Sequence, residues 1–205
     1  MDNKFTLYAY NFRSRAERVL WTLRECELAY EVIRLDPFKG ESRTPEFLRL
    51  NPSGKIPVLV QGDEVMTESV AIMEYLNDLS QRGLMPCEPK ALYQYRKVVH
   101  YGLTEIEPYM WLSEQARRLK GLYHWPEGTY EESINRVNES LQIVPQWLAA
   151  NEFISGDAFS LADIYYYHLI TWAAQHDDIE TPTGTRDYLR KLERRAAFPQ
   201  DMIPR

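Results

Sequence analysis

Residues 51–76 read NPSGKIPVLVQGDEVMTESVAIMEYL, and they carry the clearest indication of the fold class. It opens on Asn51-Pro52-Ser53-Gly54, which is the chemistry of a turn. The apolar run IPVLVQ at residues 56–61 then predicts a strand. Gly62-Asp63 predicts a hairpin turn into a short strand over residues 64–66. Apolar residues recur at helical spacing in VAIMEYL, so the stretch predicts a turn, a hairpin and a helix in direct succession.

Upstream of this stretch the chain alternates between strand and helix patterns. Residues 5–10 and 30–35 are rich in aromatic and β-branched residues, which favours strands. Between them, apolar residues at 16, 19, 20 and 23 share one helical face. A strand–helix–strand unit predicts a parallel pair with a right-handed crossover, to which the hairpin adds an antiparallel edge. Residues 1–80 are therefore expected to form a thioredoxin-like α/β domain.

Downstream the character of the sequence changes. Glycine and prolines around residues 81–90 predict a linker, and little strand signal follows it. Helical patterns cover residues 92–120, 131–150, 160–175 and 186–195. Pro108 and Pro145 are expected to bend the first two of these helices. The predicted fold class is thus α/β plus all-α, with an all-helical domain over residues 91–205.

Composition excludes several classes of function. The net charge is −6 and no basic arm is present, which argues against nucleic acid as a partner. No apolar run approaches the roughly 18 residues that a membrane span needs, and the N-terminus lacks the apolar core of a signal peptide. The only cysteines, Cys26 and Cys87, form no CxxC motif, so a reducing, cytoplasmic compartment is expected. The four histidines show no metal-ligand spacing, and no metal is predicted.

The segment around Ser14 admits two readings. Ser14 and Glu17 fit the capping box S-x-x-E at the start of a helix. A capping hydroxyl accepts from a backbone N–H, so its own proton stays free to donate to an anion, including a thiolate, at the positive end of the helix dipole. The nearby Arg13, Arg15 and Arg18 are expected to form a solvated helix face.

Two further positions also carry a structural and a functional reading. Pro57 opens a strand, where it removes a ladder donor; it is either an ordinary edge proline or a cis proline that turns the Ile56 backbone outward to pair with an extended peptide. Thr67-Glu68-Ser69 precedes a helix and is either a cap or a binding site for an amino-acid head. In the second case the helix start and Ser69 hold a carboxylate and Glu68 holds an ammonium.

Taken in order, YNFRSRAER, NPSGKIPVL and ESVAIMEYL resemble the glutathione-binding half of the cytosolic glutathione transferase superfamily. A further match, GDAFSLAD at residues 156–163, resembles the motif that caps the core helix of the family's second domain, with Ser160 and Asp163 as the capping box. The resemblance covers nearly the whole chain. It implies an enzyme that uses glutathione as co-substrate and adds its sulfur to a small electrophile, with no metal.

The resemblance also assigns the residues that bind glutathione. Ile56 would pair with the cysteinyl unit through its main chain, and Pro57 would be the cis proline. Glu68 and Ser69 would hold the γ-glutamyl head. Lys55 and Lys39 would hold the glycyl carboxylate.

The thiolate donor remains open at this stage. Alignment with tyrosine-type members places Ala9 at their catalytic position, and alignment with serine- and cysteine-type members places Arg13 there. Ser14 is favoured because a hydroxyl at a helix start suits a thiolate, and Tyr10, Tyr8 and Arg13 are the alternatives.

The electrophile is expected to bind between the domains, where clefts usually form. The candidates on the long second-domain helix are Tyr101, Glu105, Tyr109 and Trp111, which ordinary helix packing would also explain. The family implies a homodimer and a detoxification-type role. A non-catalytic binding protein and a glutathione-dependent peroxidase are the alternative functions.

Overall fold

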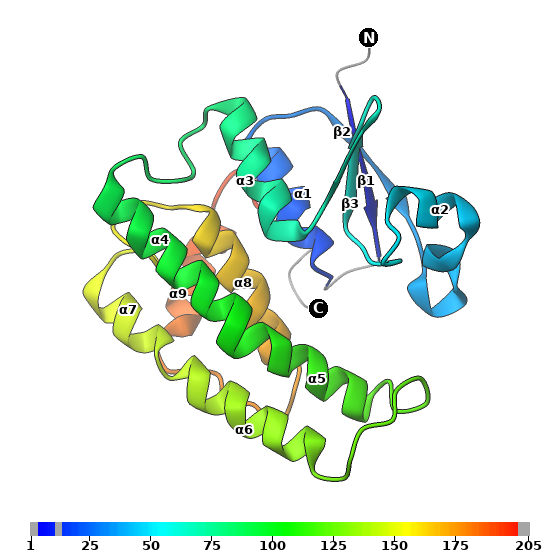
Figure 1. The fold of residues 1–205 in the computed structure, drawn as a ribbon. Helices are drawn as coiled ribbons and strands as arrows, with labels where there is room; N and C mark the ends of the chain where they lie inside the picture. Colours follow the sequence, from blue (N-terminus) through cyan, green and yellow to red (C-terminus); the bar gives the residue numbers. More distant parts are fainter. Residues whose placement is uncertain (1–3, 11–13, 201–205) are drawn as a thin grey trace. The chain divides into compact units, whose positions relative to one another are not determined.

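The computed structural model describes residues 4–10 and 14–200. The N-terminal part of the chain forms a four-stranded mixed sheet. The strands are β1 (Phe5–Ala9), β2 (Tyr30–Arg34), β3 (Val58–Gln61) and β4 (Glu64–Thr67), in the order β2-β1-β3-β4. β1 pairs with β2 in parallel, while β3 is antiparallel to both β1 and β4 (Figure 1). The predicted parallel pair and antiparallel edge are therefore confirmed.

Two helices pack against each other and against this sheet. α1 (Ala16–Glu25) contacts β1, and α3 (Ser69–Ser80) contacts α1 and β4. Alternate residues of β1 are buried, as a strand with one face on a core requires, and both helices bury an apolar face. The core is built from Leu7, Val19, Leu23, Leu59 and Leu76, all fully buried.

The segment between β2 and β3 holds short helices that the sequence patterns above did not predict. They are η1 (Pro37–Lys39), η2 (Glu41–Arg43) and α2 (Pro45–Leu50). α2 begins where Thr44 accepts a hydrogen bond from the Phe47 N–H at 3.3 Å, with Pro45 in the first turn. A capping threonine followed by proline is a typical helix start, so the signal was available.

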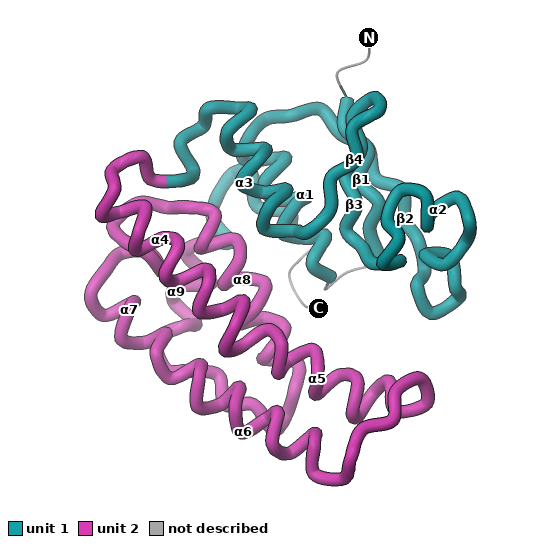
Figure 2. Tube along the Cα trace, viewed as in Figure 1, with its two compact units in different colours: residues 1–85, 193–205 teal, residues 86–192 magenta. Residues whose placement is uncertain are grey.

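The chain divides into two units, drawn in different colours in Figure 2. The first comprises residues 1–85 and 193–205, and the second residues 86–192. The division near residue 85 falls inside the predicted linker. The segment after residue 192 belongs with the first unit, which no local sequence pattern predicted.

The second unit is built from helices, as predicted, in the part of the chain that the structure describes. They are α4 (Pro89–Tyr101), the π-helical turn η3 (Gly102–Ile106), α5 (Glu107–Arg117), α6 (Thr129–Leu141), α7 (Val144–Ala150), α8 (Leu161–Ala173) and α9 (Thr185–Glu193). α8 is the centre of the unit, because nearly all its residues are buried. None of the helices described is long and apolar enough to cross a membrane.

Of the two long helices predicted here, the first is continuous and the second is interrupted. The pattern over residues 92–120 forms one helical run from α4 through the π-helical turn η3 into α5, and at η3 Gly102 faces Tyr165 so closely that a Cβ would lie 2.4 Å from the ring. The pattern over residues 131–150 ends at Leu141, and Pro145 lies in the first turn of α7 instead of kinking a continuous helix. Proline lacks an N–H, so it is tolerated best in a first turn.

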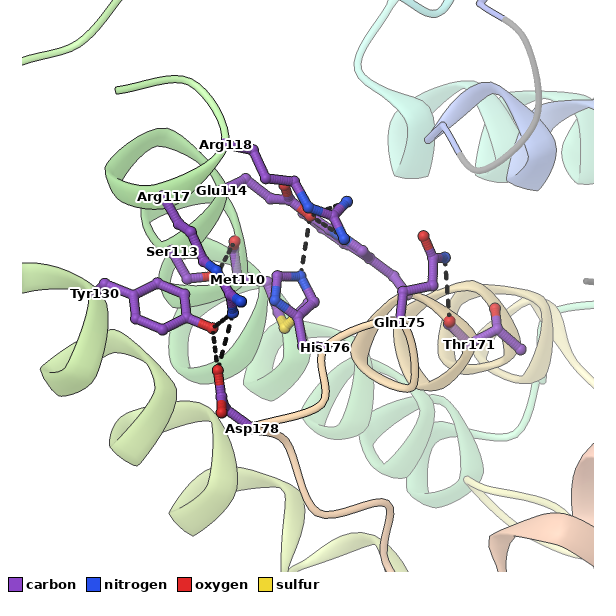
Figure 3. A network of polar contacts seen from close by, with 11 residues as sticks. Met110, Ser113, Glu114, Arg117, Arg118, Tyr130, Thr171, Gln175, His176 and Asp178 are labelled. Carbon is purple, nitrogen blue, oxygen red and sulfur yellow. Dashed lines mark hydrogen bonds and ion pairs between the residues drawn. The ribbon is translucent and has the colours of Figure 1, made fainter. Parts of the chain in front are cut away.

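A polar network ties the segment after α8 to α5 (Figure 3). The Glu114 carboxylate accepts hydrogen bonds from Trp172 at 3.1 Å and His176 at 2.9 Å, and Arg118 lies 3.3 Å away. Burial alone would raise the pKa of Glu114, but these hydrogen bonds and the Arg118 charge outweigh it and hold that pKa below its ordinary value. Glu114 is therefore ionised at neutral pH, and its carboxylate holds α8 and the segment after it against α5.

Candidate active site

The sheet topology brings the three motif segments to one end of the sheet. β1 and β2 run in parallel, so Ala9 and Arg34 lie side by side at their carboxyl ends. β3 begins at this same end, because Val58 pairs with Tyr8. β4 ends there, because Thr67 pairs with Val58. Tyr10 after β1, Pro57 before β3 and Glu68 after β4 therefore lie at the same end of the sheet, as the predicted glutathione site requires.

The segment before β3 presents Ile56 and Pro57. The Ile56–Pro57 peptide bond is cis, as the resemblance implied. Pro57 is buried, Ile56 is half-buried, and both precede the first ladder pair of β3. Among the described residues none forms a hydrogen bond with the Ile56 backbone, so its N–H and C=O are available to an extended peptide.

Asn51 shapes the turn that leads into this segment, a role that the sequence patterns did not assign. Its side-chain amide donates to the Lys55 carbonyl at 2.7 Å, and its Oδ1 accepts from the Ser53 N–H at 3.1 Å. Gly54 adopts φ +63, where an added Cβ would also lie 2.6 Å from the Arg43 guanidinium. Asn51 and Gly54 thus fix the path of the chain just before Ile56.

The start of α3 combines strain with open hydrogen-bond donors. Glu68 is exposed and adopts φ +68, ψ 108, an unusual conformation for a residue with a side chain. Ser69 follows as the first helical residue and is 7% exposed. No described residue accepts from the N–H groups of residues 69–71, and Glu68 makes no side-chain cap. Such a helix start favours an anionic ligand.

Arg18 supports this helix start, although the sequence indicated a solvated position. The expected solvated arginine face is wrong for Arg18, which is 0% exposed. Its Nη1 donates to the Ser69 Oγ at a long 3.4 Å. The reason is that α1 packs against α3, so the helix face carrying Arg18 is covered by α3 instead of water. Arg18 therefore places a fixed positive charge beside Ser69.

The start of α1 differs from the capping box predicted at Ser14 and Glu17. α1 begins at Ala16 with Arg15 as the N-cap residue, and Arg15 makes no side-chain cap. The Ser14 Oγ accepts from the Ala16 N–H at 3.4 Å, two residues ahead, while its carbonyl accepts from the Glu17 N–H at 2.9 Å. The Ser14 hydroxyl thus accepts from the Ala16 N–H and not from the Glu17 N–H that the box requires, and the helix starts one residue later than the motif implies. Ser14 still lies at the helix N-terminus, half-buried, with its hydroxyl proton available.

The alternative thiolate donors occupy different settings. Tyr8 and Tyr10 pack edge-on against Phe47 and Phe38, with ring centroids 5.8 Å and 5.6 Å apart. The Tyr10 carbonyl accepts from Arg34 at 3.2 Å. Arg13, the other alternative, lies outside the described residues.

The two lysines lie on the segments that flank this end of the sheet. Lys55 is exposed and immediately precedes Ile56. Lys39 is exposed on η1, with its ammonium 3.8 Å from the Asp36 carboxylate. Both are accessible to a ligand carboxylate, and Lys39 already has a weak surface partner.

The four residues proposed for the electrophile lie along consecutive turns of α4, η3 and α5. Tyr101 donates to the Ser140 carbonyl at 3.2 Å and packs edge-on against Trp147, so its ring is part of the packing of the second unit. Glu105 is exposed, while Tyr109 and Trp111 are half-buried. Their role in binding stays a prediction.

No metal centre is evident among residues 4–10 and 14–200. Within these ranges, no group of three or more His, Cys, Asp or Glu side chains is arranged to hold an ion.

Comparisons with known proteins place this geometry in a family. The family models named "Glutathione S-transferase, N-terminal domain" and "Glutathione S-transferase, C-terminal domain" match residues 4–78 and 105–188. Glutathione S-transferase F10 of Arabidopsis thaliana is 33% identical over 165 residues, which cover 78% of this chain and 76% of that protein. Glutathione S-transferase 1 of Dianthus caryophyllus is 32% identical over 168 residues, or 79% and 74% of the two chains.

Solved structures show the same architecture. The glutathione transferase URE2P6 of Phanerochaete chrysosporium, in complex with oxidized glutathione, has a TM-score of 0.82 at 26% identity, covering 98% of this chain and 95% of that one. With both family models matched over most of its length, the chain belongs to the glutathione S-transferase family.

Proposed function

We propose that the chain is a glutathione S-transferase that adds the glutathione thiolate to small electrophiles. One observation supports the proposal: Ile56-Pro57 and Glu68-Ser69 lie at the end of the sheet where β1 ends, and Ser14 follows β1 in the sequence, just before α1. Together they offer an anion site, an unpaired peptide edge and a hydroxyl at a helix start. Glutathione has the complementary parts, namely a zwitterionic head, an extended backbone and a thiol.

Each segment then has a defined task. The Ile56 N–H and C=O pair with the cysteinyl unit, next to the cis proline Pro57. Ser69 and the first N–H groups of α3 bind the γ-glutamyl carboxylate, and Glu68 binds the ammonium. Lys55 and Lys39 hold the glycyl carboxylate. The tripeptide is thus held at its cysteinyl backbone, its γ-glutamyl head and its glycyl carboxylate, and the cysteinyl thiol is the group that remains to be activated.

Ser14 is the donor that we propose for the thiolate. A free thiol has a pKa of about 8.5, and one pKa unit corresponds to about 1.4 kcal/mol. A hydrogen bond to a charged acceptor contributes about 1.5–3 kcal/mol, and a helix terminus adds about 0.3–1 kcal/mol. The two effects together lower the thiol pKa by about one to three, to neutrality or below, and the thiolate is the nucleophile.

The direct test is turnover of a chlorinated dinitroaromatic with glutathione, alongside calorimetry with glutathione alone. Binding together with turnover above the uncatalysed rate is the expected result. Binding without turnover on several electrophiles would favour a non-catalytic binding protein, and absence of binding at millimolar glutathione would remove the proposal altogether.

Replacing Ser14 by Ala is expected to shift the pH profile of conjugation upward by roughly one unit, because the bound thiol loses one hydrogen bond worth about 1.5 kcal/mol. The measurement is kcat/KM against pH for the two proteins. A Ser140→Ala variant, which removes a half-buried hydroxyl from α6 of the second unit, serves as the control. An unshifted Ser14→Ala profile would transfer the role to Tyr10, Tyr8 or Arg13.

We also propose a homodimer, supported by exposed apolar side chains. Val65 on β4 and Tyr75 and Leu79 on α3 are 40%, 42% and 48% exposed. Tyr75 and Leu79 are four residues apart and share a helix face, and α3 contacts β4. On α4 of the second unit, Tyr93 is 61% exposed. Sedimentation equilibrium should give twice the chain mass, and the Leu79→Glu variant should lower it.

The proposed setting is the cytoplasm, with a detoxification-type role and no metal. Cys26 and Cys87 are both free thiols, which suits a reducing compartment that also holds glutathione. Tyr109, Trp111 and Glu105 remain the residues proposed to contact the electrophile, while Tyr101 would act mainly by packing.

A further inference from the structure

The segment that follows α9 returns to α1, about 170 positions earlier in the chain. The Arg195 Nε donates to the Glu25 Oε1 at 2.7 Å, and its Nη2 donates to the Oε2 at 2.9 Å. This is a bidentate arginine–carboxylate pair, the geometry that makes an ion pair both strong and directional. The Glu25 side chain is only 9% exposed and that of Arg195 31%, so the pair is largely withdrawn from water.

Aromatic packing reinforces the same contact. The Trp21 indole N–H donates to the Glu25 Oε1 at 2.9 Å. The Trp21 ring is fully buried and meets Phe198 edge-on, with centroids 4.9 Å apart and an interplanar angle of 87°. Phe198 is itself 2% exposed. Two side chains of α1 and two of the returning segment therefore form one buried clasp.

The clasp lies on the face of α1 that also reaches the predicted glutathione site. Arg18, Trp21 and Glu25 are spaced by three and four residues, so they share one helix face. Arg18 donates to Ser69 at the start of α3. One end of this face is thus held by the returning segment, and the other end supports the residue proposed to bind the γ-glutamyl carboxylate.

We propose that Arg195 and Phe198 are positioning residues for glutathione, which act through α1 on Arg18 and Ser69. The inference rests on the proposed function. An α-helix moves as a rod, so a change in the rotation or translation of α1 at Glu25 also moves Arg18, about two turns away. The clasp fixes that rotation, and with it the position of the Arg18 guanidinium beside Ser69.

The test compares two charge reversals that are neighbours in the sequence. Arg195→Glu places like charges at Glu25, whereas Arg194→Glu makes the same change at an exposed position. We expect Arg195→Glu to weaken glutathione binding by roughly threefold to thirtyfold, the range that coupling between packed elements produces. The kcat at saturating glutathione should stay close to that of the unaltered chain, and Arg194→Glu should leave both quantities unchanged.

Arg195→Lys provides the graded variant, because lysine keeps the charge but loses the bidentate fork. It should fall between the unaltered chain and Arg195→Glu, and it decides the matter if Arg195→Glu does not fold. A purely structural role predicts a lower unfolding midpoint with an unchanged KM for glutathione in both Arg195 variants, and that result would overturn the inference. Absence of glutathione binding by the unaltered chain would instead overturn the proposed function from which the inference starts.

Discussion

Replacing Asp163 by Ala is expected to lower the free energy of unfolding by at least about 3 kcal/mol, because three buried donors would lose their acceptor at about 1–3 kcal/mol each. Asp163 is 0% exposed at the start of α8. Its Oδ1 accepts from the Ile154 N–H at 2.9 Å and the Tyr188 hydroxyl at 2.8 Å, and its Oδ2 accepts from the Ser160 N–H at 2.8 Å. One carboxylate thus joins the loop before α8, the helix start and α9.

The measurement is thermal unfolding, with an expected fall in the midpoint of about 6–12 °C for a chain of this size. Asp157→Ala is the matched control, because Asp157 is exposed and accepts only a long 3.4 Å contact from the Glu152 N–H. A surface change of this kind should stay within about 0.5 kcal/mol of zero. Equal midpoints for the two variants would show that the Asp163 network adds nothing to stability.

Replacing Ser69 by Ala is expected to weaken glutathione binding by about 10-fold to 100-fold, the loss that corresponds to one hydrogen bond to a charged group. Ser69 is buried at the first turn of α3 and is the residue that Arg18 contacts. The substitution removes the hydroxyl proposed to bind the γ-glutamyl carboxylate and also removes an acceptor beside the Arg18 guanidinium. Calorimetric titration with glutathione is the measurement.

Ser80→Ala is the control for this experiment, since it removes a hydroxyl from the last turn of the same helix, where it donates to the Asn77 carbonyl at 3.2 Å and hydrogen-bonds the Cys26 thiol. Its affinity for glutathione should match that of the unaltered chain. If Ser69→Ala bound glutathione as tightly as Ser80→Ala, the carboxylate would have to bind elsewhere than at the start of α3.

Most of the fold followed from local patterns. The strands and the two covering helices of the first unit were predicted because alternation and helical periodicity report which face is buried. The second capping box, at Ser160 and Asp163, is present as the motif predicted. The π-helical turn η3 was less predictable, since it lies where Gly102 meets the Tyr165 ring, which is distant in sequence.

Some residues of the candidate site could likewise be predicted from the sequence, and others could not. Pro57, Glu68 and Ser69 stand out in the sequence because proline and helix-start residues carry a local conformational signal. Arg18 gave no such signal: a charged residue on a helix is normally solvated, and only the packing of α3 on α1 buries it. The Glu25–Arg195 pair could not be predicted from the sequence either, because periodicity describes one helix or strand at a time and does not indicate a partner 170 positions away.

Residues 193–200 belong with the first unit, so this unit is completed late in biosynthesis. Ribosomes release a chain from its amino end at about 5–20 residues per second, and domains generally fold in that order. Here the sheet and α1 emerge early, yet Trp21 and Glu25 meet Phe198 and Arg195 only after the helical unit has been translated. The half of the protein that is made first is therefore the half that matures last, and until then a nascent chain exposes an indole and a carboxylate to chaperones and proteases.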